Sequence, residues 1–113
     1  MTGNEYQKQA MKFASSVSTE TKEQLLIQGV MGMNGEAGEA IDLVKKHLFH
    51  GHDLDKEHLA KELGDVMWYI ATSAEAIGYK LDDIMQMNID KLTARYGDHF
   101  DSEKSKHRKE GDI

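Results

Sequence analysis

The apolar residues of this chain recur at intervals of three and four along most of its length, which is the period of an α-helix. The pattern predicts four helices, over about residues 4–15, 22–48, 56–77 and 81–96. No proline occurs in the 113 residues, which suits a protein made of helices. We therefore expect an all-α fold, a bundle of four to five helices.

Each of the last three predicted helices carries an apolar stripe that we expect to point into the core. The stripes comprise Val30, Met33, Ala37, Ile41, Val44 and Leu48 in the second helix, Leu59, Leu63, Val66, Ile70, Ala74 and Ile77 in the third, and Leu81, Ile84, Met85, Asn88, Ile89 and Leu92 in the fourth.

Local signals mark the ends of these helices. Thr21 and Gln24 have the spacing of a capping box, and Asp55 is a favourable N-cap. Gly78 and Gly97 are natural C-terminal stops.

The second helix also contains a glycine at every third position from 29 to 38. A glycine inside a helix costs roughly 0.5–1 kcal/mol relative to alanine. Either the helix bends near residues 29–35, or another part of the chain approaches its backbone closely there.

Residues 101–113 (DSEKSKHRKEGDI) have four acids, four bases and a single apolar residue, at the end. Such a segment cannot bury an apolar face, so we expect a charged, mobile tail. Residues 1–100 are expected to form one helical domain, with no repeat and no second domain.

Composition excludes several functional classes. The formal net charge is −6 and the isoelectric point is about 5.4, which argues against a nucleic-acid binder. No apolar run approaches the ~20 residues that span a bilayer, and no signal peptide is visible, so we expect a cytoplasmic protein without a membrane segment. The chain has no cysteine, so any metal must be held by oxygen or imidazole.

Two acidic pairs carry most of the chemical information: Glu36 with Glu39, and Glu62 with Asp65. Residues three apart on a helix lie about 60° apart around its axis, so the members of each pair repel. The two pairs occupy equivalent positions relative to the apolar stripes of their helices. If those helices pack antiparallel, the four carboxylates converge on one site.

Four carboxylates without a thiolate suit Mg²⁺, or alternatively Mn²⁺. We expect two or more ions, because one would leave much of the negative charge unbalanced. Such sites activate a water and stabilise charge on a phosphoryl oxygen.

Three segments, GEAGEAIDLVKK, KELGDVMWYI and NIDKLTARYGDHF, resemble the MazG-like family of all-α nucleoside triphosphate pyrophosphohydrolases. The resemblance covers roughly residues 25–100 and rests on ExxE, then ExxD, then KLxxRY. It implies a helical bundle that assembles as a homodimer or homotetramer. It also implies Mg²⁺-dependent hydrolysis of nucleoside triphosphates between the α- and β-phosphates, giving a monophosphate and pyrophosphate.

Carried over by motif position, the four acids would be metal ligands, and Glu39 would also orient or deprotonate the attacking water. Lys91 and Arg95 match the family's basic pair, thought to hold phosphates, and Asn88 lies nearly on the same face. These residues are hypotheses that the resemblance supplies.

Further substrate-binding candidates have structural alternatives. Lys45 and Lys46 either bind phosphate or interact with the helix dipole. Tyr69 is expected to stack on a base or to bond a phosphate, whereas Trp68 either contacts substrate or packs in a core or a subunit interface.

Two aromatic residues of the first helix, Tyr6 and Phe13, are candidates for contact with the base, although core packing is favoured for Phe13. His47, His50 and His52 with Asp53 form either a Zn²⁺ or Ni²⁺ site or a polar loop.

His58, one turn before Glu62, is expected to partner that carboxylate.

Alternatives to the pyrophosphohydrolase remain open from sequence. One is a phosphoribosyl-ATP pyrophosphohydrolase, which has similar chemistry. A second is a module that binds metal and nucleotide without turnover. A third is a purely structural helical oligomer.

Overall fold

The computed structural model describes residues 1–14, 20–108 and 111–113, and in this part of the chain the regular structure is entirely helical. The elements are α1 (Gly3–Ala10), the 3₁₀ helix η1 (Met11–Phe13), α2 (Lys22–Phe49), α3 (Lys56–Ala76), α4 (Leu81–Tyr96) and α5 (Ser102–Lys106). The all-α class is confirmed. The first helix is shorter than the predicted 4–15, because α1 ends at Ala10, η1 ends at Phe13 and Ala14 is already extended.

The predicted helix ends are confirmed by their local geometry. The Thr21 hydroxyl accepts from the Gln24 N–H at 3.1 Å while the Gln24 side chain accepts from the Thr21 N–H at 3.3 Å, a complete capping box. Asp55 accepts from the His58 N–H at 3.0 Å and so caps α3. Gly78 and Gly97 adopt φ of 79° and 77°, values that favour glycine and allow the chain to leave α3 and α4.

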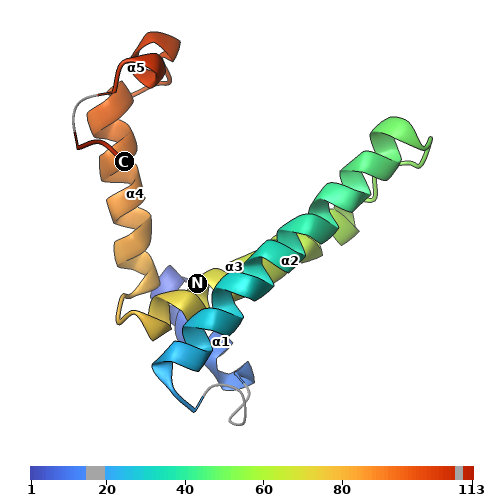
Figure 1. The fold of residues 1–113 in the computed structure, drawn as a ribbon, viewed down its shortest axis with the longest axis horizontal. Helices are drawn as coiled ribbons and strands as arrows, with labels where there is room; N and C mark the ends of the chain where they lie inside the picture. The colour runs from blue at the N-terminus through green and yellow to red at the C-terminus, as the bar shows by residue number, and fades with distance from the viewer. Residues whose placement is uncertain (15–19, 109–110) are drawn as a thin grey trace.

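Helices α2 and α3 form a long two-helix arm, joined by the loop at its far end (Figure 1). A Cβ atom on Gly29 would overlap the Ser73 side chain, and one on Gly32 would overlap the Tyr69 ring. Since α2 continues as one helix through these glycines, they serve close approach of α3, the second of the two alternatives.

A small core lies where α1 packs against α3 and the start of α4. Ala10, Ala71 and Leu81 are buried there, with Trp68 against them. The Gln7 side chain, 5% exposed, accepts from the Leu81 N–H at 2.8 Å and donates to the Tyr79 carbonyl at 3.0 Å. This buried amide ties α1 to the turn between α3 and α4.

Helix α4 diverges from the arm, so the molecule has the outline of a V (Figure 1). Its radius of gyration is 17.0 Å, against about 13 Å for a compact domain of this length. Several residues of the predicted inward stripes are consequently exposed in the single chain: Val30, Ile41, Val44, Leu48, Leu63, Ile77, Met85, Ile89 and Leu92. The prediction that one chain buries them is wrong, because periodicity identifies an apolar face but not what covers it.

The C-terminal segment contains α5 and an ion pair between Asp112 and Arg95. Residues 109 and 110 of the segment expected to be mobile lie outside the described residues. Within the described ranges, no helix combines the length and apolar character that a membrane span requires.

Candidate metal centre

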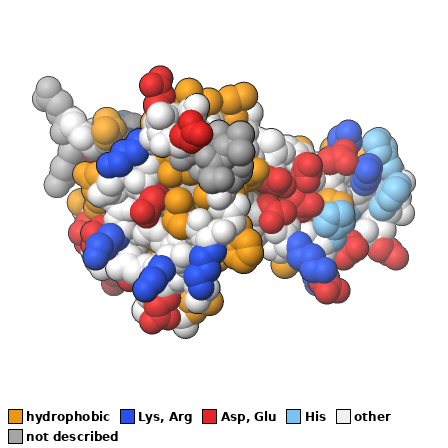
Figure 2. Space-filling view, turned by 90° about the horizontal axis from the view of Figure 1, so that it is seen from below, with side chains coloured by type: hydrophobic (Ala, Val, Ile, Leu, Met, Phe, Trp, Pro, Cys, Tyr) orange, Lys and Arg blue, Asp and Glu red, His pale blue; other side chains and the backbone are white. Residues whose placement is uncertain are grey.

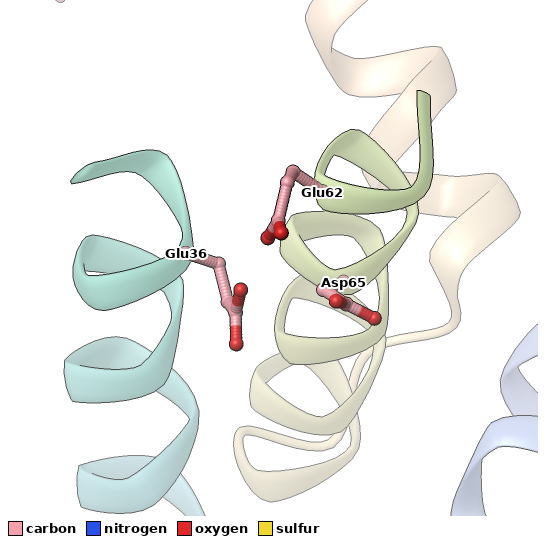
Figure 3. Close-up of side chains that lie close together, drawn as sticks. All are labelled: Glu36, Glu62 and Asp65. Atoms are coloured by element: carbon pink, nitrogen blue, oxygen red, sulfur yellow. The ribbon is translucent and has the colours of Figure 1, made fainter. Parts of the chain in front are cut away.

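Three of the four predicted ligands come together midway along the arm. Glu36 projects from α2 toward Glu62 and Asp65 of α3, and a carboxylate oxygen from each lies within 4.8 Å of the other two (Figure 3). Among the described residues, this is the only group of three or more acidic or histidine side chains close enough to share an ion. The antiparallel packing of α2 on α3 creates it.

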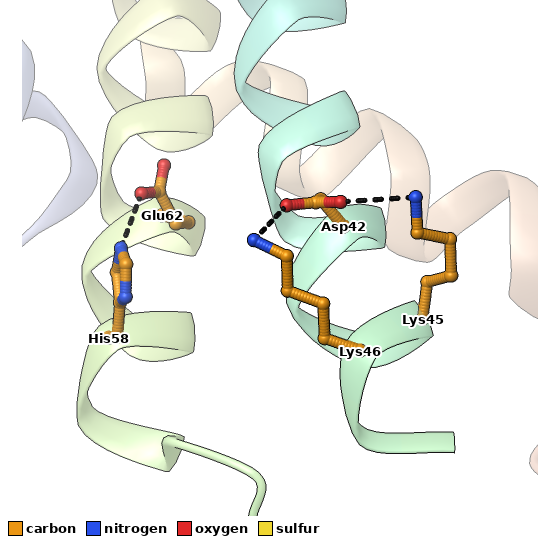
Figure 4. A network of polar contacts seen from close by, with 5 residues as sticks. All are labelled: Asp42, Lys45, Lys46, His58 and Glu62. Atoms are coloured by element: carbon orange, nitrogen blue, oxygen red, sulfur yellow. Dashed lines mark hydrogen bonds and ion pairs between the residues drawn. The ribbon is translucent and has the colours of Figure 1, made fainter. Parts of the chain in front are cut away.

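Two carboxylate oxygens of this centre lack a hydrogen-bond partner. Glu62 is 8% exposed, and its Oε1 lies 3.0 Å from His58 Nε2, in the contact expected from the sequence (Figure 4). The Oε2 atoms of Glu62 and of Glu36 are buried and have no hydrogen-bond partner. Because an unpaired buried oxygen is costly, a bound cation fits this donor set, and three carboxylates suit a hard ion such as Mg²⁺.

The pKa values of Glu36 and Glu62 also indicate that a cation fits this centre. The pKa of Glu36 is raised to about 7, first because a proton on it lets it hydrogen-bond to Glu62, then by burial and by the charges of Glu39 and Asp65. The same contact with Glu36 lowers the pKa of Glu62, aided by Glu39 and His58. Without a cation, Glu36 therefore holds a proton up to near neutral pH.

Glu39 lies at the rim of this centre. It is exposed and lines a groove of about 490 Å³ together with Glu62 and His58. Glu39 is thus not one of the three converging ligands, although it is close enough to influence Glu36 and Glu62.

The groove also receives one of the two predicted lysines. Both Lys45 and Lys46 pair with Asp42, at 3.3 and 2.9 Å (Figure 4). Of the two lysines, only Lys46 lines the groove, and Asp42 lines it as well. Sequence reasoning had not singled out Asp42, although it lies one turn beyond Glu39.

The two adjacent aromatic residues of α3 have different environments. Trp68 donates its indole N–H to the Ala10 carbonyl at 3.0 Å and packs on the core, so the structure favours its packing role. Tyr69 lies over Gly32 and lines a second groove on the arm.

The two aromatic candidates of the first helix also differ. Tyr6 packs against the core, and burial and the Asp65 charge raise its pKa. Phe13 is 76% exposed, so the packing favoured for it is not found.

The structure does not bring the predicted phosphate-binding residues of α4 to the carboxylates. Lys91 and Asn88 are exposed on a helix that leads away from the arm (Figure 1). Arg95 donates two hydrogen bonds to Asp112, both of 2.7 Å. Within one chain, these three residues and the metal centre belong to different limbs of the V.

The histidine-rich loop does not form a metal site of this kind. His47 Nδ1 lies 2.8 Å from the His52 carbonyl oxygen and donates to it. Figure 2 shows one cluster of acidic side chains on the arm, with histidines toward the arm's far end. The alternative of a polar loop fits this geometry.

The chain is similar to known proteins over most of its length. The model of the MazG nucleotide pyrophosphohydrolase domain matches residues 22–100. The Gene 37 protein of Mycobacterium phage L5 is 41% identical over 69 residues, which cover 58% of this chain and 60% of that protein. The chain therefore matches less than two thirds of that relative's length. No solved structure matches the chain.

Proposed function

Because the chain belongs to the MazG nucleotide pyrophosphohydrolase domain family, we propose that it hydrolyses nucleoside triphosphates between the α- and β-phosphates. The products are a nucleoside monophosphate and pyrophosphate. The observation that carries the proposal is the centre of Glu36, Glu62 and Asp65, in which two buried carboxylate oxygens have no partner.

These three carboxylates would hold Mg²⁺, or Mn²⁺, with Glu39 completing the set at the rim, and two or more ions are expected. When bound, the ions supply charge stabilisation for the phosphates and acidify a coordinated water. Glu39, exposed in the groove, would orient that water or accept its proton. His58 holds Glu62 in position through their 3.0 Å contact.

Phosphate binding would start with Lys46, which lines the groove. Lys91 and Arg95 would come from a second copy of the chain, since α4 of the same chain diverges from the arm. The apolar faces exposed on α2, α3 and α4 supply a reason to associate. We therefore expect a homodimer or homotetramer as the active form.

The test is turnover of a panel of canonical and modified nucleoside triphosphates and deoxynucleoside triphosphates, together with phosphoribosyl-ATP. We expect pyrophosphate and monophosphate with Mg²⁺, and none with EDTA. Release of orthophosphate would mean cleavage at a different bond and would contradict the mechanism.

Site variants separate the proposed roles. Glu39→Gln should lower kcat by orders of magnitude if this carboxylate acts on the water. Glu57→Gln is the matched control, because that side chain is 82% exposed elsewhere on α3. Wild-type turnover in Glu39→Gln would refute the role of Glu39.

A further inference from the structure

A second groove adjoins the metal centre on the arm. Its volume is about 590 Å³, within the range of small-molecule sites. Five of its lining residues belong to the N-terminal half of α2 and one to α3: Gln24, Ile27, Gln28, Met31, Gly32 and Tyr69. None of them is charged, in contrast to the acidic groove beside it.

The two grooves lie on the same side of the arm. On α2, Gln28 and Met31 line the second groove, and Gly35, Gly38 and Asp42 continue the same three- and four-residue spacing along the acidic groove. On α3, Tyr69 follows Asp65 by one turn, about 6 Å along the helix axis. The uncharged groove therefore begins where the carboxylates end, within the reach of one bound molecule.

Two glycines of α2, Gly35 and Gly38, form part of the surface of the acidic groove. At Gly35 and Gly38 a Cβ would meet no atom within 4 Å, so packing within the chain does not require either glycine. Both line the acidic groove, where they leave the α2 backbone open to close approach by a ligand. The 8% exposed Glu62, which also lines this groove and has an unpartnered oxygen, points independently to a ligand there.

The second groove has the chemistry of a site for an uncharged ring. Tyr69 is held edge-on by Trp68, with the ring centroids 4.9 Å apart and the planes at 77°, and it offers an aromatic surface for stacking. The amide oxygen of Gln24 accepts from the Thr21 N–H, which anchors this side chain at the wall. The amides of Gln24 and Gln28 carry both donor and acceptor groups, which a heterocyclic base can pair with.

We propose that the base and sugar of the substrate occupy this groove, with the phosphates running along the glycine surface to the carboxylates. The inference rests on the proposed function and extends it: Gln28 and Gln24 make the enzyme selective for the base, and Tyr69 stacks on it. Met31, 69% exposed, forms the outer edge of the site.

Two substitutions test the groove without touching a carboxylate. Gln28→Met removes the amide at similar size, and should reduce the ratio of kcat/KM between the best and worst bases by tenfold or more. Met31→Trp narrows the groove and should raise KM tenfold or more. Mg²⁺ affinity, measured by calorimetry, should not change in either variant. Gln9→Trp is the control, an exposed residue of α1 that lines neither groove, and should leave the kinetics unchanged.

Unaltered base selectivity in Gln28→Met together with unaltered KM in Met31→Trp would overturn the inference while leaving the pyrophosphohydrolase proposal intact. If Gln28→Met does not fold, the exposed position of Met31 lets that variant decide alone. Circular dichroism establishes folding in each case.

If wild-type protein releases no pyrophosphate from any nucleotide, the proposed function is refuted. A binding measurement then tests whether the groove holds the base. Trp68 is the only tryptophan of the chain and lies against Tyr69. Analogues with a nitrogen bridge between the α- and β-phosphates should therefore quench its fluorescence to a degree that depends on the base. No quenching by any analogue would overturn the inference.

Discussion

Replacing Glu36 by glutamine should stabilise the metal-free protein while reducing its stabilisation by Mg²⁺ to little. Glu36 faces Glu62 across the two helices of the arm, and its pKa is raised from 4.5 to about 7. The folded state thus binds this proton more tightly than the unfolded state does. Stability is consequently lost as pH rises from 4.5 through 7, and above pH 7 the charged Glu36 opposes folding.

The size of this effect follows from the shift in pKa. A rise of this extent corresponds to about 3 kcal/mol at pH 8, as an upper value. Glu36 is only half-buried, so solvent screening should reduce the effect to roughly half. For a domain of this size, about 1.5 kcal/mol corresponds to an increase in Tm of roughly 5–10 °C.

Thermal unfolding in EDTA at pH 8 tests the expectation, with and without excess Mg²⁺ in a parallel series. Wild-type protein should gain Tm on adding Mg²⁺, whereas Glu36→Gln should begin higher and gain little. Glu57→Gln, at the exposed ion pair with Lys61, should shift Tm by little. A lower Tm for Glu36→Gln than for wild type in EDTA would refute the view that the uncompensated carboxylates oppose folding.

Three further outcomes follow from the contacts. Because Glu36 holds a proton up to about pH 7, Mg²⁺ affinity measured by calorimetry should rise between pH 5.5 and 8 with release of a proton; a pH-independent affinity would contradict this. Gly32→Ala should lower unfolding free energy in urea by about 1–3 kcal/mol, because its Cβ overlaps the Tyr69 ring, whereas Gly38→Ala, with open space, should not destabilise. Gln7→Ala should lower the free energy of unfolding by about 1–3 kcal/mol in the same assay, since it leaves two backbone groups beside α4 without their partner. An unchanged free energy of unfolding would show that this amide contributes little to stability.

Local signals predicted the helices well. Apolar spacing of three and four identified α2, α3 and α4, and the Thr21–Gln24 capping box, Asp55, Gly78 and Gly97 marked their ends. These features depend on residues within one or two turns of each other, so they are visible in sequence. The contact between His58 and Glu62 is of the same kind, one turn apart on α3.

Arrangement between elements was harder to predict. Equivalent positions of the acidic pairs indicated a shared site, but the approach of α2 to α3 brings Glu36, Glu62 and Asp65 together and leaves Glu39 at the rim. The groove beside Tyr69 had no local signal, because its lining combines isolated residues of two helices.

The sequence by itself determined where helices form, which faces are apolar and that paired carboxylates are the ligands offered to a metal, since these depend on residue type and short-range spacing. Tertiary structure alone decided what each face meets. It placed Trp68 under α1, paired Arg95 with Asp112, and directed α4 away from the arm. The apolar stripes therefore remain exposed in one chain, because a helical period identifies a surface to be covered but not the surface that covers it.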